Sequence, residues 1–567
     1  MERARELERR DDSAGARALC DEALSRDPQH AGVHCMLGRL YGQAGELDRA
    51  FLHFSEASRL APELDEAHLG LGNVHRLRGE AQSAVASYRR ALAANDESPI
   101  AHHYLGIVLR HLGQLPDALA HFRRAASLDP TSTGAFKDYA LCQLQMDSYD
   151  DALATVHHGL SITPESGELY AVRGMIRQAM HEPQAALECY EKAQSLGHSD
   201  AELWKNLGIV YQELGRLADA LASFDGALAL KPDFPVARFH RALAELLAGD
   251  YANGWPDYEL RLISEDRPRR STAHPRWEGS ALAGRTILVY GEQGFGDEIM
   301  FASCLPEIVD GAHVCIIECS EKLEHLFRRS FPRAHVYAAA ADRPVPEPAR
   351  TAAIDCEVPI GSLPLYLRRS VGEFPHHEGY LVAEPRRVTA WRERLQTLGP
   401  GLKVGISWRG GTHKTRRPLR SIPLSQWQPV FQATDAQYVS LQYGDCQADL
   451  EELERQGVRI AHWQDAIDDY EETAALLNGL DLVISVCTAV IHLGGALARP
   501  VWVMTPYSPE WRYGIAGASM PWYSSVRLFR QPSFGDWPAV IAAVARELKA
   551  LASGTGQCPS EKNQGRT

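Results

Sequence analysis

The sequence lacks any long apolar run, and it is short of positive charge. No segment approaches the roughly 20 apolar residues that cross a bilayer, and the charged start MERARELERRDD has no signal-peptide core. The 73 acidic residues outnumber the 59 lysines and arginines, giving a net charge of −14. A general nucleic-acid binder normally carries a basic face. We therefore expect a cytoplasmic chain without a membrane span or a nucleic-acid partner.

Metal-binding and redox patterns are also missing. The 11 cysteines are dispersed without CxxC pairs, and Cys315 and Cys319 lie in an apolar run. Buried thiols in a reducing compartment account for them. No paired-carboxylate motif and no His/Cys cluster argues for hydrolysis or for a metal. We expect no metal and no cofactor.

What the first half does have is a 34-residue pattern, which recurs in six successive windows from 31 to 234. The pattern residues are Leu37, Gly38, Tyr41, Ala50, Phe54, Ala57 and Pro62 in window 31–64, and Trp204, Leu207, Gly208, Tyr211, Ala220, Phe224, Ala227 and Pro232 in window 201–234. Small residues let two helices approach closely, and large residues fill the gaps between them. This pattern resembles the tetratricopeptide repeat and predicts an α superhelix over 1–268 with atypical end units.

Polar side chains on the first helices of these units are candidates for a groove that binds a polypeptide. The opposing interpretation is that each is simply a solvated surface position. The candidate acceptor-binding residues are Arg39, Asn73, Arg76, His103, Arg110, Lys137, Gln178, Lys205 and Gln212.

Near residues 265–284 the composition shifts to Pro, Arg, Ser and Gly, and short β-branched runs then alternate with helical patterns. Such alternation predicts parallel sheets covered on both faces. We predict a linker over 269–284, two doubly wound Rossmann-like domains over 285–395 and 396–552, and a disordered tail over 553–567. The expected strands are Thr286–Tyr290, His313–Glu318, Lys403–Trp408, Gln437–Leu441, Asp481–Val486 and Val501–Met504; the expected helices include 298–309, Ser320–Arg329, Tyr470–Asn478 and Asp536–Leu551.

The first chemical motif is the glycine-rich turn Gly291–Asp297, which follows a strand and precedes a helix. Glycines such as Gly294 and Gly296 let the backbone approach a ligand at a helix start. The spacing is neither a Walker A loop nor a dinucleotide fingerprint. Asp297 either caps the helix or acts as a general base.

The second motif is a basic loop after the strand that ends near Trp408. Its five cations would hold a diphosphate or sugar phosphate by charge-assisted hydrogen bonds, unless neighbouring carboxylates neutralise a solvated loop. The cations are Arg409, Lys414, Arg416, Arg417 and Arg420.

The third motif is the turn Cys487-Thr488-Ala489, which joins a buried strand to a helix carrying His492. Free amides at the helix start, with the Thr488 hydroxyl, predict an anion site. His492 is either a structural histidine or part of that site.

These three motifs, in this order over 285–552, resemble the heptosyltransferase-like bacterial glycosyltransferases. The resemblance implies a metal-independent GT-B fold of two Rossmann-like domains with a nucleotide-sugar in the cleft. It implies that Asp297 is the catalytic base and that Arg409, Lys414 and Arg420 contact donor phosphate. The family's Asp-Thr-Gly-x-x-His-Leu motif matches 487–493, with Cys487 in place of Asp and Ala489 in place of Gly.

Helical repeats joined to such a domain are also similar to protein O-GlcNAc transferases. Those line the superhelix with an asparagine ladder, whereas here only Asn73 and Asn206 fall in the first-helix windows. A closer likeness is to bacterial repeat-plus-transferase proteins that modify flagellin with nonulosonic sugars. The resemblance implies a protein glycosyltransferase acting on Ser or Thr of an acceptor held by the repeats, with flagellin as one candidate. The alternative is a non-catalytic scaffold beside a degenerate transferase domain.

Overall fold

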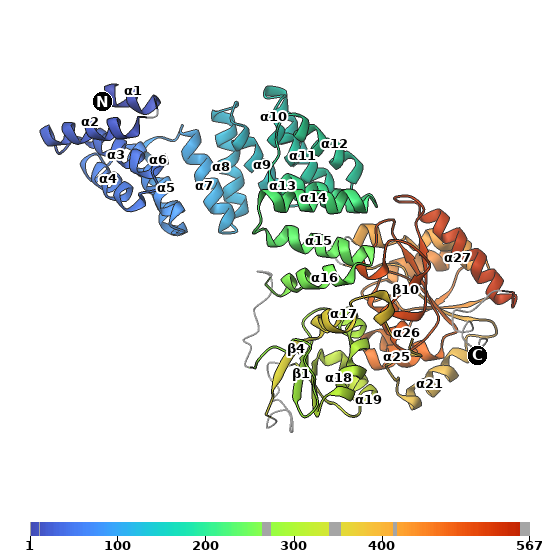
Figure 1. Cartoon of the computed structure of the whole chain (residues 1–567). Helices are drawn as coiled ribbons and strands as arrows, with labels where there is room; N and C mark the ends of the chain where they lie inside the picture. Colours follow the sequence, from blue (N-terminus) through green and yellow to red (C-terminus); the bar gives the residue numbers. More distant parts are fainter. Residues whose placement is uncertain (1, 11, 264–273, 340–352, 412–416, 556–567) are drawn as a thin grey trace. The chain divides into compact units, whose positions relative to one another are not determined.

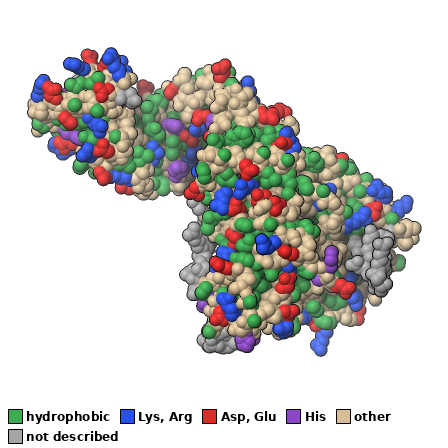
Figure 2. Space-filling view, viewed as in Figure 1, with side chains coloured by type: hydrophobic (Ala, Val, Ile, Leu, Met, Phe, Trp, Pro, Cys, Tyr) green, Lys and Arg blue, Asp and Glu red, His purple; other side chains and the backbone are tan. Residues whose placement is uncertain are grey.

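The computed structural model describes residues 2–10, 12–263, 274–339, 353–411 and 417–555 (Figure 1). The chain divides into two compact units, Met1–Leu203 and Trp204–Thr567. Charged groups of both signs are interspersed on the face shown in Figure 2. Among the helices of the described segments, none combines the length and the apolar character that a membrane span requires.

The first unit consists of antiparallel helix pairs, as the repeat pattern predicts. Its helices are α1 (Glu2–Arg9), α2 (Ser13–Arg26), α3 (Ala31–Gln43), α4 (Leu47–Leu60), α5 (Asp65–Leu77), α6 (Ala81–Ala94), α7 (Pro99–His111), α8 (Leu115–Leu128), α9 (Thr133–Gln145), α10 (Tyr149–Ile162), α11 (Gly167–Ala179), α12 (Pro183–Ser195) and the start of α13 (Ala201–Glu213).

Each well-formed repeat packs an aromatic ring of its second helix on a glycine of its first. A Cβ added at Gly72 would lie 2.4 Å from the Tyr88 ring, and one added at Gly106 would lie 2.7 Å from the Phe122 ring. Both rings are fully buried. Only glycine permits this approach, which explains why the sequence pattern is strict at that position.

The second unit opens with helices that still follow the repeat pattern: the rest of α13, then α14 (Leu217–Leu230), α15 (Pro235–Ala248) and α16 (Tyr251–Tyr258), followed by a 3-10 turn over Glu259–Ile263. The division of the chain into compact units falls at 203, although the repeat-like helices continue beyond it. The physical reason is that Tyr251, Trp255 and Tyr258 of α16 are buried in the same apolar core as the α/β region.

The predicted linker over 269–284 is packed where the structure describes it, from 274 onward. Trp277 is buried, its amide donates to the Glu357 carbonyl at 2.9 Å, and the Glu357 amide donates to Pro275 at 2.9 Å. Residues 269–273 and 556–567 of the predicted linker and tail lie outside the described segments.

The first α/β lobe has a parallel four-stranded sheet in the order β3-β2-β1-β4. Strands β2 and β3 lie on one side of β1 and β4 on the other, so the strand order reverses beside β1. The elements are β1 (Thr286–Tyr290), α17 (Phe295–Phe301), α18 (Leu305–Gly311), β2 (Val314–Cys319), α19 (Glu324–Ser330), β3 (His335–Ala338), β4 (Cys356–Pro359) and α20 (Pro364–Leu367).

The second lobe has a seven-stranded sheet in the order β10-β11-β9-β8-β5-β6-β7, parallel except for the edge strand β10. Here the order reverses beside β5. The elements are α21 (Pro385–Gln396), β5 (Lys403–Ser407), α22 (Gln428–Phe431), β6 (Gln437–Ser440), α23 (Gln447–Arg455), β7 (Ile460–Ala461), α24 (Gln464–Asp468), α25 (Tyr470–Gly479), β8 (Leu482–Val486), α26 (Ala489–Ala496), β9 (Val501–Thr505), β10 (Ser519–Met520), β11 (Tyr523–Arg530) and α27 (Trp537–Ala552).

The parallel α/β architecture is confirmed, and all six predicted strands are present within one residue of their expected ends. The predicted helix over 298–309 is instead two helices, α17 and α18, because Pro306 starts a new helix near the N-terminus of α18. The closing helix α27 is capped by Asp536, which accepts from the Ala539 amide at 3.1 Å. In doubly wound sheets, ligands bind at the carboxyl ends of the strands where the order reverses. The loops after β1 and β5 occupy those positions.

Candidate functional site

A cavity of about 510 Å³ lies at the carboxyl ends of both sheets. Seven of the nine residues predicted for catalysis or donor binding line it: Gly294, Gly296, Asp297, Arg420, Thr488, Ala489 and His492. They come from segments as far apart in sequence as α17 and α26. The structure thus brings together three motifs that the sequence could place only one at a time.

Close packing of α17 on α26 forms one wall of the cavity. A Cβ at Gly296 would lie 3.2 Å from His492 and 3.4 Å from the Ala489 backbone. On the other side, a Cβ at Gly410 would lie 2.5 Å from the Cys487 carbonyl. Glycine at both positions lets the three loops converge.

A chain of ion pairs crosses the cavity. Arg512 donates to Asp297 at 2.6 Å and lies 3.2 Å from Glu510. Glu510 also pairs with Arg420, whose second amino group donates to the Cys487 carbonyl at 2.8 Å. Burial alone would lower the pKa of Arg512, but Asp297 and Glu510 raise it above its usual value. Both guanidinium groups therefore stay charged beside the cavity.

The start of α26 supplies the amides that the sequence predicted. Thr488 occupies the position just before the helix, and its hydroxyl meets that of Ser485 at 3.0 Å rather than capping its own helix. Burial raises the pKa of the neighbouring Cys487 thiol to about 11. Cys487 is therefore uncharged, so its contribution to an anion site is its backbone.

His492 is a neutral hydrogen-bonding group. Burial, together with Arg512 and Arg420, lowers its pKa well below the usual range. Its Nδ1 lies 3.1 Å from the Tyr523 hydroxyl, which also meets the Tyr380 hydroxyl.

The proton of the Tyr380 hydroxyl goes to the Ile299 carbonyl at 2.6 Å. Tyr380 thus connects the Tyr523–His492 pair to the backbone of α17.

Of the predicted donor-binding residues that the structure describes, Arg409 does not line the cavity. Arg409 donates to the Asp445 carbonyl at 2.5 Å and pairs with Asp449 at 3.3 Å, which fits the alternative of a paired loop. Lys414 lies outside the described residues.

Sequence reasoning missed the cavity residues Glu510 and Arg512, which come after β9 in no recognised motif. It also missed the aromatic residues that line another side of the cavity. Phe295 and Tyr443 are 37% and 50% exposed, and the Phe295 ring lies 5.7 Å from that of Tyr470. Exposed aromatic rings beside cations suit a planar base or a sugar. The sequence signal for these aromatic residues was Phe295, which lies one position before the Gly296-Asp297 pair.

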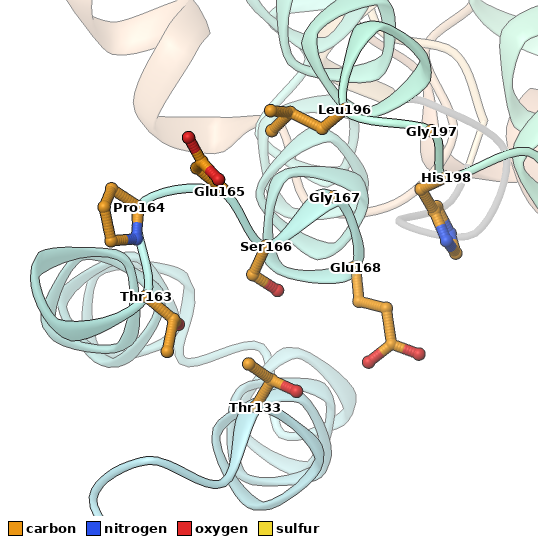
Figure 3. A pocket seen from close by; sticks show the side chains of 10 residues that line it. All are labelled: Thr133, Thr163, Pro164, Glu165, Ser166, Gly167, Glu168, Leu196, Gly197 and His198. Atoms are coloured by element: carbon orange, nitrogen blue, oxygen red, sulfur yellow. The ribbon is translucent and has the colours of Figure 1, made fainter.

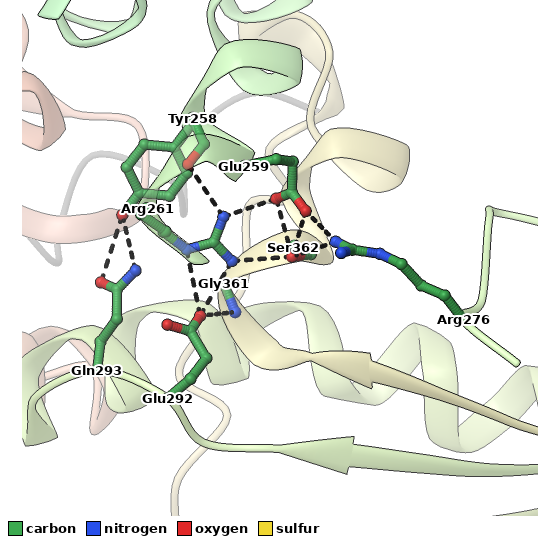
Figure 4. A network of polar contacts seen from close by, with 8 residues as sticks. All are labelled: Tyr258, Glu259, Arg261, Arg276, Glu292, Gln293, Gly361 and Ser362. Atoms are coloured by element: carbon green, nitrogen blue, oxygen red, sulfur yellow. Dashed lines mark hydrogen bonds and ion pairs between the residues drawn. The ribbon is translucent and has the colours of Figure 1, made fainter. Parts of the chain in front are cut away.

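The glycine-rich turn is held in place by a buried polar network from the end of α16 (Figure 4). Arg261 contacts Glu292 at 3.0 Å, Glu259 at 2.6 Å and the Ser362 hydroxyl at 2.8 Å. The Glu292 carboxylate also accepts from the Gly361 amide at 3.1 Å. The last repeat-like helix is therefore attached directly to the loop that leads to Asp297.

The repeat positions predicted to contact an acceptor make intramolecular contacts. Their groove role remains a prediction, since the same groups can exchange partners. The contacts are Arg39 with Glu8 at 2.7 Å, Arg110 with Asp138 at 3.3 Å, His103 with Asp138 at 2.8 Å, Lys137 with Glu168 at 3.5 Å, Asn73 with the Tyr88 hydroxyl at 2.8 Å, Arg76 over the Tyr104 ring at 5.0 Å, Gln178 with the Tyr190 hydroxyl at 3.2 Å, Lys205 at 5.9 Å from the Phe234 ring centre, and the Gln212 carbonyl with Ser508 at 2.7 Å.

The first unit has a hollow of its own, of about 680 Å³, where helix starts and turns meet (Figure 3). Figure 3 shows Thr133, Ser166 and Glu168 around it, with Leu196 at its apolar edge. None of the predicted acceptor-binding residues lines it, although Lys137 pairs with Glu168. This hollow is therefore a feature of the repeat surface that the sequence pattern did not indicate.

Comparison with known families identifies the helical region. A tetratricopeptide-repeat sequence model matches residues 1–65, 35–99, 69–133, 172–235 and 205–269, and a second matches 109–176. The amino-terminal helices are therefore tetratricopeptide repeats, which imply a protein partner. Protein FlbA of Caulobacter vibrioides is 34% identical over 365 residues, and the match spans 60% of this chain and 60% of that relative.

Solved structures with similar helical repeats are distant. A tetratricopeptide repeat protein from Parabacteroides merdae is 18% identical with a TM-score of 0.37, covering 43% of this chain and 96% of that one. YrrB, described as having an unusual peptide-binding site, is 24% identical with a TM-score of 0.28, covering 31% of this chain and 91% of that one.

Proposed function

We propose that the chain is a metal-independent protein glycosyltransferase with a GT-B arrangement of its two α/β lobes. A nucleotide-sugar binds in the 510 Å³ cavity, and a protein acceptor is recognised by the repeats in the cytoplasm. The observation that carries the proposal is the convergence of seven predicted residues on that cavity. Flagellin is the candidate acceptor and a nonulosonic acid the candidate sugar, as the sequence resemblance implies.

The chemistry follows from the charges around the cavity. An acceptor Ser or Thr oxygen attacks the anomeric carbon, and the bond from that carbon to the phosphate oxygen breaks. The electron pair leaves with the nucleotide, stabilised by Arg420, Arg512 and the amides at the start of α26. Asp297 takes the hydroxyl proton. No further reactant is required.

Arg512 has two roles in this scheme. It orients the Asp297 carboxylate through their 2.6 Å contact, and it faces the departing phosphate. Positioning of this kind suits a donor that already carries a good leaving group. The apolar and aromatic side of the cavity, with Phe295, Tyr443 and Tyr470, holds the base or the sugar.

The test is the variant Asp297→Asn in the full chain, co-expressed with flagellin. We expect nucleotide binding by calorimetry to remain and the glycan mass on flagellin to disappear in intact-mass spectrometry. Asp310→Asn is the matched control, because Asp310 lies on the same lobe and is 70% exposed. Unchanged glycan mass in Asp297→Asn would remove the base assignment.

The scaffold alternative makes a different prediction. A degenerate domain would leave the wild-type chain unable to bind any of UDP, GDP, dTDP or CMP, while the repeats still captured the partner. The uncharged Cys487 at the family's carboxylate position is the observation that favours it. Binding of any one of these nucleotides at the cavity would exclude it.

A further inference from the structure

Glu510 occupies the centre of the cationic side of the cavity. It pairs with Arg420 through one carboxylate oxygen and lies 3.2 Å from Nε of Arg512 through the other. Arg420 and Arg512 are 14% and 15% exposed, so water screens these contacts only in part. A carboxylate that bridges two buried guanidinium groups sits where a ligand's anionic groups would bind.

The four charges of these ion pairs cancel one another. Arg420 and Arg512 are balanced by Glu510 and Asp297, which leaves no net attraction for an anion from this set. An incoming anion that displaces Glu510 gains the contacts that this carboxylate makes with both arginines. Displacing both carboxylates would leave a second charge without a partner, which is costly in a partly buried site.

Glu510 is the carboxylate that can leave. Its side chain is 33% exposed, against 21% for Asp297. It lies in the loop after β9, immediately before the 3-10 turn Trp511–Tyr513, on the same lobe as both arginines. Its backbone belongs to a loop, whereas Asp297 lies in the first turn of α17 on the other lobe.

We propose that Glu510 is an internal competitor that occupies the anion site until the phosphate of a ligand replaces it. This rests on the proposed nucleotide-sugar function. Two oxygens of one phosphate lie at a spacing similar to the two carboxylate oxygens of Glu510, so a ligand phosphate can bridge both arginines in its place. Glu510 thereby lowers the affinity of the site for every phosphate ligand.

The experiment is calorimetric titration of the full chain with UDP, CMP, inorganic pyrophosphate and inorganic phosphate. In Glu510→Gln we expect tighter binding on the order of tenfold for all anions, because one competing charge is gone. Glu547→Gln is the matched control, since Glu547 is 31% exposed and pairs with Arg527 at 2.7 Å away from the cavity.

Glu510→Asp provides a second variant that keeps the charge but shortens the side chain, and its affinities should fall between those of wild type and Glu510→Gln. All 11 tryptophans lie in the second unit, so their fluorescence reports whether either variant is folded. Equal or weaker binding in folded Glu510→Gln, with wild type still binding, would overturn the competitor role alone. Failure of every probe to bind wild type and both variants would overturn the proposed function as well.

Discussion

Ion pairs between repeats join residues about one repeat length apart in the sequence, whereas ion pairs at the cavity of the α/β unit join residues that are much farther apart. In the repeats, Arg39 and Glu8 are 31 residues apart and Arg78 and Asp48 are 30 apart, close to one repeat length. In the α/β unit, Arg420 and Glu510 are 90 apart. Arg512 and Asp297 are 215 apart. The first kind joins neighbouring copies of one pattern, and the second kind joins loops from different strands.

The two kinds of ion pair differ in what their loss does to the rest of the structure. A repeat pair lies at the surface between similar helices, so its loss leaves the neighbouring contacts intact. A cavity pair is partly buried, and its partners are held by separate loops, so its loss leaves a charge without compensation. Long-range pairs of this kind are thus costly to build, and two of them lie beside the cavity.

The largest expected effect comes from breaking a buried long-range pair at Arg261. Its side chain is 5% exposed and contacts both Glu259 and Glu292. Arg261→Gln leaves these carboxylates facing each other, and the second unit should lose about 3–5 kcal/mol of unfolding free energy. Denaturant unfolding followed by tryptophan fluorescence measures this, because all 11 tryptophans lie in that unit.

Arg39→Gln is the matched control from the repeats. Arg39 is 44% exposed in its pair with Glu8, so about 0–1 kcal/mol should be lost. Similar losses in Arg39→Gln and Arg261→Gln, each followed by far-ultraviolet circular dichroism, would contradict the comparison.

Much of the repeat architecture could be predicted from the sequence because the same residue spacing recurs from repeat to repeat. The contact of Gly72 with Tyr88 and that of Gly106 with Phe122 follow one spacing. Six of the strands were also predictable, since runs such as Thr286–Tyr290 are buried and rich in β-branched residues. The sequence analysis did not predict β3, β4 or the eight-residue strand β11. Strands β7 and β10 have two residues each and carry no periodic signal.

The candidate site was predictable only in part. Glycines mark the turn at 291–297, and the end of a buried apolar strand marks the turn at 487–489, so these motifs could be found locally. Glu510 and Arg512 could not, because nothing in the segment after β9 indicates that Asp297 will face it. The burial of Trp255 beside Trp511 could not be predicted for the same reason, because it depends on a contact made 256 positions later.

A second prediction tests the strictness of the repeat rule within one helix, α3. A Cβ at Gly38 would lie 2.8 Å from the Phe54 ring, whereas a Cβ at Gly42 would lie 3.9 Å from Ala50. Gly38→Ala should therefore cost about 1–3 kcal/mol through overpacking. Gly42→Ala should gain up to about 1 kcal/mol, because alanine favours helix.

Circular dichroism during denaturation measures both variants. Tryptophan fluorescence should stay unchanged, since the first unit contains no tryptophan. A loss in Gly42→Ala as large as in Gly38→Ala would show that helix propensity and packing had been misassigned.

The smallest expected effect is a pH dependence confined to the repeats, where a histidine pair recurs at the same positions of two units. Nδ1 of His53 lies 3.0 Å from His34, and Nδ1 of His121 lies 2.9 Å from His102. Burial first, and then the partner imidazole, lower the pKa of His53 and of His121; the other charged groups that face them are Asp21, Arg49, Asp117 and Arg89.

Unfolded histidine titrates near pH 6.5, so below that pH the unfolded repeats bind more protons than the folded ones. Stability is therefore present above about pH 6.5 and falls as the pH drops through the lowered values. Hydrogen exchange of α3–α4 and α7–α8 in the full chain, corrected for intrinsic rates, measures this from pH 7.5 to 5. The double variant His53→Gln/His121→Gln should show a flatter profile than wild type, and identical slopes would exclude the histidine pairs as the cause.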